Sequence, residues 1–159
     1  MKSERSGIKG CFIVLAGLAA MLMVHCNDAK AEGASIGGYD VAKIAASTLN
    51  VLKEKSVIAE PVEKEFADLL SDWPADPLAL GPSFADFYSR LGAVLIEKNI
   101  ASQKDVDNAA TAAAQSGGIK IGGVNPVVLA ASYLNILVQK GIITLPAAQS
   151  ILDSSKIPQ

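Results

Sequence analysis

Sulfur, histidine and aromatic side chains are scarce in this 159-residue sequence. It has two cysteines, Cys11 and Cys26, one histidine, His25, and an aromatic content of 5%. All three of these reactive residues precede residue 32, so residues 32–159 contain neither cysteine nor histidine. That part of the chain therefore cannot form a disulfide, a cysteine or Ser-His-Asp active site, or a zinc or haem site with Cys or His ligands.

The sequence also lacks an excess of basic charge, because it has 14 Lys and Arg residues and 16 Asp and Glu residues, which gives a net charge of −2. No basic stretch follows the first ten residues, which argues against a nucleic-acid partner. The glycines at 117, 118, 122 and 123 do not match a phosphate-binding pattern, and we expect them to form a flexible link before a helix. We expect a protein that is not an enzyme and that uses no cofactor or metal.

The start of the chain has the three parts of a secretory signal peptide. Residues 1–10 carry three basic side chains, residues 11–24 are apolar, and two alanines two positions apart end at Ala31. The apolar run is short for a membrane-spanning helix, which needs about 20 residues. We expect residues 1–31 to be a cleaved signal peptide and the protein to be exported, either periplasmic or secreted. The alternative is a membrane anchor, formed by an uncleaved leader or by a lipidated Cys26.

The rest of the chain contains an internal repeat. Residues 36–61 align with residues 121–146 at a constant offset of 85, and twelve of the 26 aligned positions are identical. Residues 94–100 match residues 51–57 at an offset of 43, which indicates a weaker middle copy. The sequence therefore predicts three copies with a period of 42–43 residues.

Each copy has the pattern of two helices joined by a tight turn. The first helix should end where a lysine precedes a residue that tolerates the left-handed conformation, at Lys55-Ser56, Lys98-Asn99 and Lys140-Gly141. The predicted fold is a single all-α domain over residues 32–159. It consists of three tandem helical hairpins, at about 39–73, 82–116 and 124–156.

Side chains that can cap a helix stand at the expected helix starts. Asn125 precedes a proline at the first helical position of the last copy. Two pairs have the spacing of a capping box, Ser83 with Asp86 and Ser102 with Asp105. We expect each pair to begin a helix.

The turn of the last copy, Leu-Val-Gln-Lys-Gly-Ile-Ile-Thr at 137–144, resembles the short helical hairpin of SHOCT-type bacterial segments. The resemblance extends over about twenty residues per copy. It implies a helical hairpin and little about function.

Carboxylates are the chemical groups that remain for catalysis. Glu65, Asp68 and Asp72 share one side of a predicted helix, and we expect this side to be solvated, because apolar residues occupy the other side. Asp105 and Asp107 lack the turn glycine and the closing glutamate of a calcium loop, so we expect them to be structural.

The aromatic residues concentrate between Trp73 and Tyr88. The spacing of Phe84, Phe87 and Tyr88 is that of a buried helix face, and we expect these rings to fill the core where the first two hairpins meet. Two alternatives involve function. Trp73 leads into a proline-rich link, where a half-exposed ring could anchor a partner, and a cavity lined by Trp73, Phe87 and Tyr88 would hold an apolar ligand.

The segment 127–138 is apolar on nearly every side of its predicted helix. Three hairpins make a small core, so we expect part of this helix, including Val128, Tyr133 and Val138, to contact a second copy, another protein or a membrane surface.

These observations favour an exported, non-enzymatic helical-repeat protein. We expect it to act in protein–protein interaction or self-assembly in the cell envelope, with a protein partner or as a homo-oligomer. The alternative function is binding of an apolar small molecule or lipid between the hairpins.

Overall fold

The structure is a computed structural model, and it describes residues 34–158. Residues 34–158 are predominantly helical, with six α-helices and one small two-stranded sheet. The predicted signal peptide, residues 1–31, lies outside the described residues. The helices are α1 (Val41–Glu54), α2 (Glu60–Ser71), α3 (Gly81–Glu97), α4 (Gln103–Gln115), α5 (Pro126–Gln139) and α6 (Leu145–Ser154). The strands are β1 (Ser35–Ile36) and β2 (Tyr39–Asp40), and a short 3₁₀ helix, η1 (Pro77–Ala79), precedes α3.

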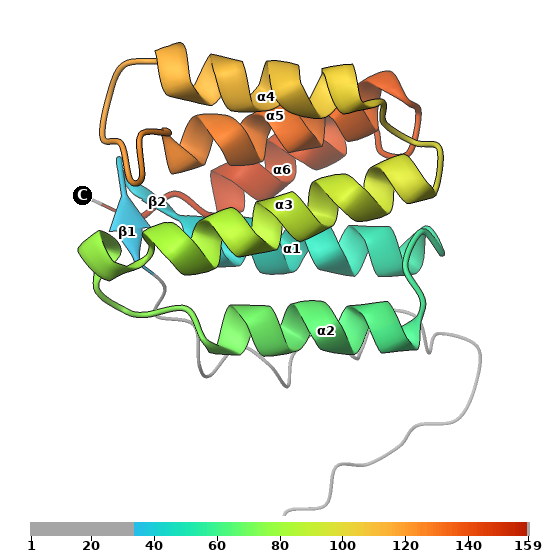
Figure 1. Cartoon of the computed structure of the whole chain (residues 1–159), viewed down its shortest axis with the longest axis horizontal. Helices are drawn as coiled ribbons and strands as arrows, with labels where there is room; N and C mark the ends of the chain where they lie inside the picture. The colour runs from blue at the N-terminus through green and yellow to red at the C-terminus, as the bar shows by residue number, and fades with distance from the viewer. Residues whose placement is uncertain (1–33, 159) are drawn as a thin grey trace, which may run out of the picture. The chain divides into compact units, whose positions relative to one another are not determined.

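The six helices divide into an inner and an outer group. The helices α1, α3 and α5 each contain seven buried residues, whereas α2 contains one and α4 and α6 contain two each. Burial of apolar side chains is the main favourable term in folding, so the inner helices supply most of the core. Each helix packs on the next along the chain, and α6 also packs on α1, which closes the arrangement (Figure 1). In the view of Figure 1, α2 and α4 lie at opposite edges of the fold.

Each inner helix ends in the same tight turn. The residues after the terminal lysines, Ser56, Asn99 and Gly141, have φ values of 56°, 57° and 71°. In all three turns, two successive backbone N–H groups then donate to one carbonyl oxygen near the end of the helix, that of Leu52, Leu95 or Leu137. These bonds satisfy carbonyl groups that the helix leaves unpaired. The predicted helix ends are therefore confirmed.

Two of the predicted helix starts are confirmed, and one is wrong. The Asn125 side chain accepts hydrogen bonds from the first turn of α5, and Ser102 and Asp105 form a reciprocal capping box on α4. Ser83 forms no cap, because η1 leads the chain directly into α3 two residues earlier, at Gly81. Leu80 is fully buried at this junction, which fixes the point where the helix begins.

Two of the three glycine pairs form tight turns, and one of these turns lies within the predicted link at 117–123. Gly37 and Gly38 have φ values of 59° and 80°, and Gly122 and Gly123 have values of 59° and 86°. Positive φ at both central positions is the geometry of a two-residue hairpin turn, which glycine adopts at low cost. The first turn joins β1 to β2, and the second is closed by an antiparallel bridge between Ile121 and Val124.

The chain entering α1 is fixed in the same way as the chain entering α5. The Asp40 backbone N–H donates to the Ser155 carbonyl oxygen at 2.8 Å, which joins the start of α1 to the end of α6. The Asn125 N–H donates to the Ala113 carbonyl oxygen at 3.0 Å, which joins the start of α5 to the second half of α4. Within residues 34–158, no helix combines the length and the apolar character that are needed to cross a membrane.

Candidate functional site

The aromatic residues of α2 and α3 form one cluster, together with Trp73 and with Tyr133 of α5. The ring centroids of Trp73 lie 5.7 Å from Phe84 and 5.4 Å from Phe87, and Phe66 lies 5.2 Å from Phe87. Phe84, Phe87 and Tyr88 are at most 2% exposed, which confirms that they belong to the core. Trp73 is half-buried and packs against this core. The sequence thus predicted the cluster, and its use as a ligand site stays a prediction.

Two polar atoms in this cluster have no hydrogen-bond partner. They are the indole N–H of Trp73 and the hydroxyl of Tyr88, and both atoms are inaccessible to solvent. Burial raises the pKa of Tyr88 far above its ordinary value and that of Tyr133 to about 12, so both hydroxyls stay protonated near neutral pH. Buried polar groups are nearly always hydrogen-bonded in native proteins, so two such exceptions in one cluster require an explanation.

The helix α5 is covered by the rest of the described chain. It packs against α1, α4 and α6, Tyr133 is 3% exposed, and Val128 and Val138 are half-buried. The chain itself therefore covers Tyr133 fully and Val128 and Val138 in part. The expectation that part of this helix contacts a second copy, another protein or a membrane surface stays a prediction.

Large exposed apolar side chains occur elsewhere. Leu78 in η1 is 88% exposed, Ile119 in the α4–α5 loop 58%, and Ile157 near the C-terminus 36%. These three segments and the β1–β2 turn lie at the left end of the view in Figure 1. We call the three segments, with the exposed side chains of Leu78, Ile119 and Ile157, the loop end. Leu145, 66% exposed, begins α6 at the opposite end, beside the tight turns.

The loop end is held by backbone interactions. The Asp76 carboxylate accepts from the Leu78 N–H at 2.9 Å, and the Ile157 N–H donates to the Gly38 carbonyl oxygen at 2.9 Å. A side chain methyl of Ile121 lies 3.2 Å from the position that a Cβ on Gly81 would take, so the α4–α5 loop contacts the start of α3. The exposed apolar residues are therefore presented on ordered segments.

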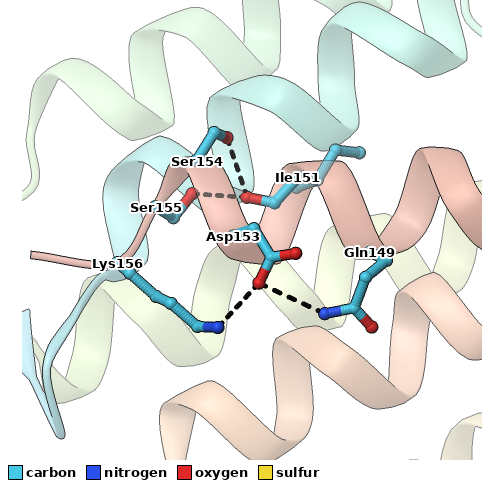
Figure 2. A network of polar contacts seen from close by, with 6 residues as sticks. All are labelled: Gln149, Ile151, Asp153, Ser154, Ser155 and Lys156. Atoms are coloured by element: carbon cyan, nitrogen blue, oxygen red, sulfur yellow. Dashed lines mark hydrogen bonds and ion pairs between the residues drawn. The ribbon is translucent and has the colours of Figure 1, made fainter.

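Charges near the loop end largely cancel. The Lys156 ammonium donates to the Asp153 carboxylate at 2.7 Å, and the Gln149 side chain donates to the same oxygen at 3.3 Å (Figure 2). The Lys156 ammonium and the Gln149 hydrogen bond lower the pKa of Asp153. The Ser154 and Ser155 hydroxyls both donate to the Ile151 carbonyl oxygen, so they close the last turn of α6 (Figure 2). This part of the surface is therefore close to neutral.

Three hollows lie between neighbouring helices. The first, of about 220 Å³ between α4 and α5, is lined by polar groups that include Asn108, Ser132 and Asn135. The other two lie on either side of α2. One of about 610 Å³ faces α1, and one of about 360 Å³ faces α3. They are lined mostly by charged side chains at the surface.

The carboxylates have structural roles or face solvent. Glu65, Asp68 and Asp72 are exposed, as expected, and Arg90 lowers the pKa of Glu65 through hydrogen bonds of 2.6 and 3.0 Å. Hydrogen bonds from Ser102 lower the pKa of Asp105. In the part of the chain that the structure describes, no group of three or more His, Cys, Asp or Glu residues could hold a metal ion. A general acid needs a raised carboxyl pKa, so these shifts have the wrong direction for that chemistry.

Sequence reasoning missed the loop end. Leu78 and Ile119 stand alone in segments rich in proline and glycine, and an isolated large apolar residue in such a loop is the signal that could have found them. No protein-family model, curated protein or solved structure matches the chain. Its function is therefore inferred from its own geometry and charge.

Proposed function

We propose that the chain is an exported, non-enzymatic protein of the cell envelope that binds a protein partner through the loop end. The observation that carries this proposal is the exposure of Leu78 on an ordered 3₁₀ turn. Large apolar side chains that are presented on rigid segments bind partners at low entropic cost. Ile119 and Ile157 are also exposed, on neighbouring segments at the same end of the fold (Figure 1).

The chemistry of the loop end favours a protein over an anionic membrane surface. Membrane-surface binding generally combines apolar side chains with an excess of lysine or arginine. Here Lys156 is paired with Asp153, and Lys120 beside Ile119 is balanced by the negative charge of Asp76 beside Leu78. A nearly neutral apolar surface suits the core of a protein interface, from which charged residues are depleted.

We also propose that the fold arose from three tandem copies of a helical hairpin, α1–α2, α3–α4 and α5–α6. The repeated turns after Lys55, Lys98 and Lys140 support this origin. The equivalent backbone bonds of Asp40 and Asn125 support it as well. Because α6 packs on α1, the first and last copies already contact each other. The binding surface is therefore sought at the loop end and not in continued stacking of copies.

Site-specific photocrosslinking in the producing cells tests the proposed function. The photoreactive residue p-benzoylphenylalanine replaces Leu78 or Ile119 in the full chain, and Leu145 provides a matched exposed control at the opposite end. We expect one discrete protein adduct from positions 78 and 119, and its mass identifies either another protein or a second copy.

Interface variants make this experiment specific. Ile119→Ser should reduce the adduct formed at position 78 by at least about tenfold, since the loss of a buried large apolar contact costs well over 1 kcal/mol. Leu145→Ser should leave the adduct unchanged. The proposal fails if position 78 gives no adduct, or if position 145 gives the same adduct.

A further inference from the structure

The helix α2 is held to the rest of the fold by few interactions. The one buried residue of α2 is Phe66. The residue that precedes the helix, Ala59, has no side chain that could cap the first turn of α2. Two ion pairs of 2.6 Å join it to its neighbours, Lys53 with Glu63 and Arg90 with Glu65. All four side chains are a third or more exposed, and exposed ion pairs contribute little to stability. Segments with few buried contacts open locally at low free-energy cost.

The surface around α2 also indicates that this helix is weakly attached to the fold. Open surface hollows of about 610 and 360 Å³ flank α2, one on the side of α1 and one on the side of α3. Between them, Phe66 and the half-buried residues Val62, Leu69 and Leu70 form its contact with the core. Outward movement of α2 would therefore break a narrow apolar seam and two exposed ion pairs.

The aromatic cluster lies beneath this seam and contains the two unpartnered donors. Phe66 and Trp73 both contact Phe87 in edge-to-face geometry, and the ring centroid of Phe87 lies 5.1 Å from that of Tyr88. The Trp73 indole N–H and the Tyr88 hydroxyl are thus buried without an acceptor among aromatic rings. Such groups are destabilising when they lack a partner, and an acceptor atom placed among these rings would remove that cost.

We propose that α2 is a lid and that the aromatic cluster beneath it binds an uncharged, flat, mainly apolar molecule with a carbonyl or ether oxygen. The rings of Phe84 and Phe87 contact the apolar body, and the Tyr88 hydroxyl or the Trp73 indole N–H donates to the oxygen. The ligand is uncharged because the nearest cation on α3, Arg90, is already paired with Glu65 at the surface, and an unpaired buried charge is costly. This site is separate from the loop end.

A pair of matched probes tests the hydrogen bond. The probe 1-acetonaphthone is flat and carries one carbonyl oxygen, and 1-ethylnaphthalene has nearly the same shape without the oxygen. Isothermal titration calorimetry of the full chain should show that 1-acetonaphthone binds about fivefold more tightly, the effect of one net hydrogen bond. The preference should disappear in the double variant Tyr88→Phe/Trp73→Phe, which keeps aromatic rings at both positions. It should persist in Tyr39→Phe, which alters a tyrosine outside the cluster.

Hydrogen exchange measured by mass spectrometry tests the lid. Amides of α2 should exchange at least about tenfold faster than those of α3 in the free chain, and 1-acetonaphthone should slow them. If the double variant does not fold, at least one of the single variants Tyr88→Phe and Trp73→Phe should lose the preference, and its retention in both overturns the hydrogen bond. Equal affinity of the two probes for the unaltered chain overturns the site. Exchange in α2 that is as slow as in α3 overturns the lid.

Discussion

The Tyr133 hydroxyl on α5 donates a hydrogen bond of 2.9 Å to the backbone carbonyl oxygen of Tyr88 on α3. The two rings also contact each other, with centroids 5.1 Å apart. The Tyr88 hydroxyl, in contrast, has no partner. Two tyrosines that lie side by side in the core thus have opposite effects on stability, one through a satisfied hydroxyl and one through an unsatisfied hydroxyl.

Removal of the two hydroxyls should therefore change stability in opposite directions. Tyr133→Phe should lower the free energy of unfolding by about 1 kcal/mol, since it deletes a buried hydrogen bond. Tyr88→Phe should leave it unchanged or raise it by up to about 1 kcal/mol, since it deletes a buried donor without a partner. Urea denaturation followed by circular dichroism measures both values. A loss of more than about 1 kcal/mol in Tyr88→Phe would show that this hydroxyl has a partner.

The same burial predicts the behaviour of the protein at alkaline pH. Burial raises the pKa of Tyr133 to about 12, whereas an unfolded tyrosine ionises near pH 10. A raised pKa in the folded state gives stability that is complete below about pH 10 and is lost as the pH rises toward 12. The free energy of unfolding should therefore fall over this window. The fall should be smaller in Tyr133→Phe, and an identical decline in the variant would assign the effect to other groups.

Gly92 on α3 allows this tyrosine pair to form. A Cβ on Gly92 would lie 2.7 Å from the Tyr133 hydroxyl oxygen and 3.2 Å from a Val106 methyl group. Alanine generally stabilises a helix by about 1 kcal/mol relative to glycine, but here the clash should cost about 1–3 kcal/mol. Gly92→Ala should thus lower the melting temperature. A double-mutant cycle with Tyr133→Phe should recover part of the loss, because the nearest clashing atom is then absent.

The three tight turns provide a test of backbone strain. Ser56 adopts a φ of 56°, a left-handed conformation that is unfavourable for residues with a Cβ, whereas glycine occupies the equivalent position at 141. Ser56→Gly should raise the free energy of unfolding by about 1 kcal/mol, and Gly141→Ser should lower it by about the same amount. Thermal denaturation measures both changes. If the two substitutions shift the melting temperature in the same direction, the turns are not equivalent.

Much of the local structure could be predicted from the sequence. Helix ends at Lys98-Asn99 and helix starts at Ser102 and Asn125 depend on hydrogen bonds between residues a few positions apart, so the sequence pattern contains the whole interaction. The burial of Phe84, Phe87 and Tyr88 follows from helical spacing in the same way. The start of α3 could not be predicted so well, because Leu80 is placed by tertiary packing and overrides the cap at Ser83.

The candidate site was only partly predictable. Trp73, Phe87 and Tyr88 do lie in one cluster, but the sequence did not show that two of their polar atoms lack partners. It also directed attention to the apolar side chains of α5, whereas the largest exposed fractions of large apolar side chains belong to Leu78, Leu145 and Ile119. Exposure depends on which distant segments cover a residue, and the pattern within one helix contains no such information.

By itself, the sequence determined the helical character, the turns and caps, and the absence of cysteine and histidine after residue 31, since each of these follows from residue type and short-range spacing. The tertiary structure alone decided that α6 packs on α1, that α5 packs against α1, α4 and α6, and that α2 contributes one buried residue, Phe66, to the aromatic cluster. These features depend on contacts between residues far apart in the chain. Their free energy comes from the apolar area that whole helices bury together, which no single segment specifies.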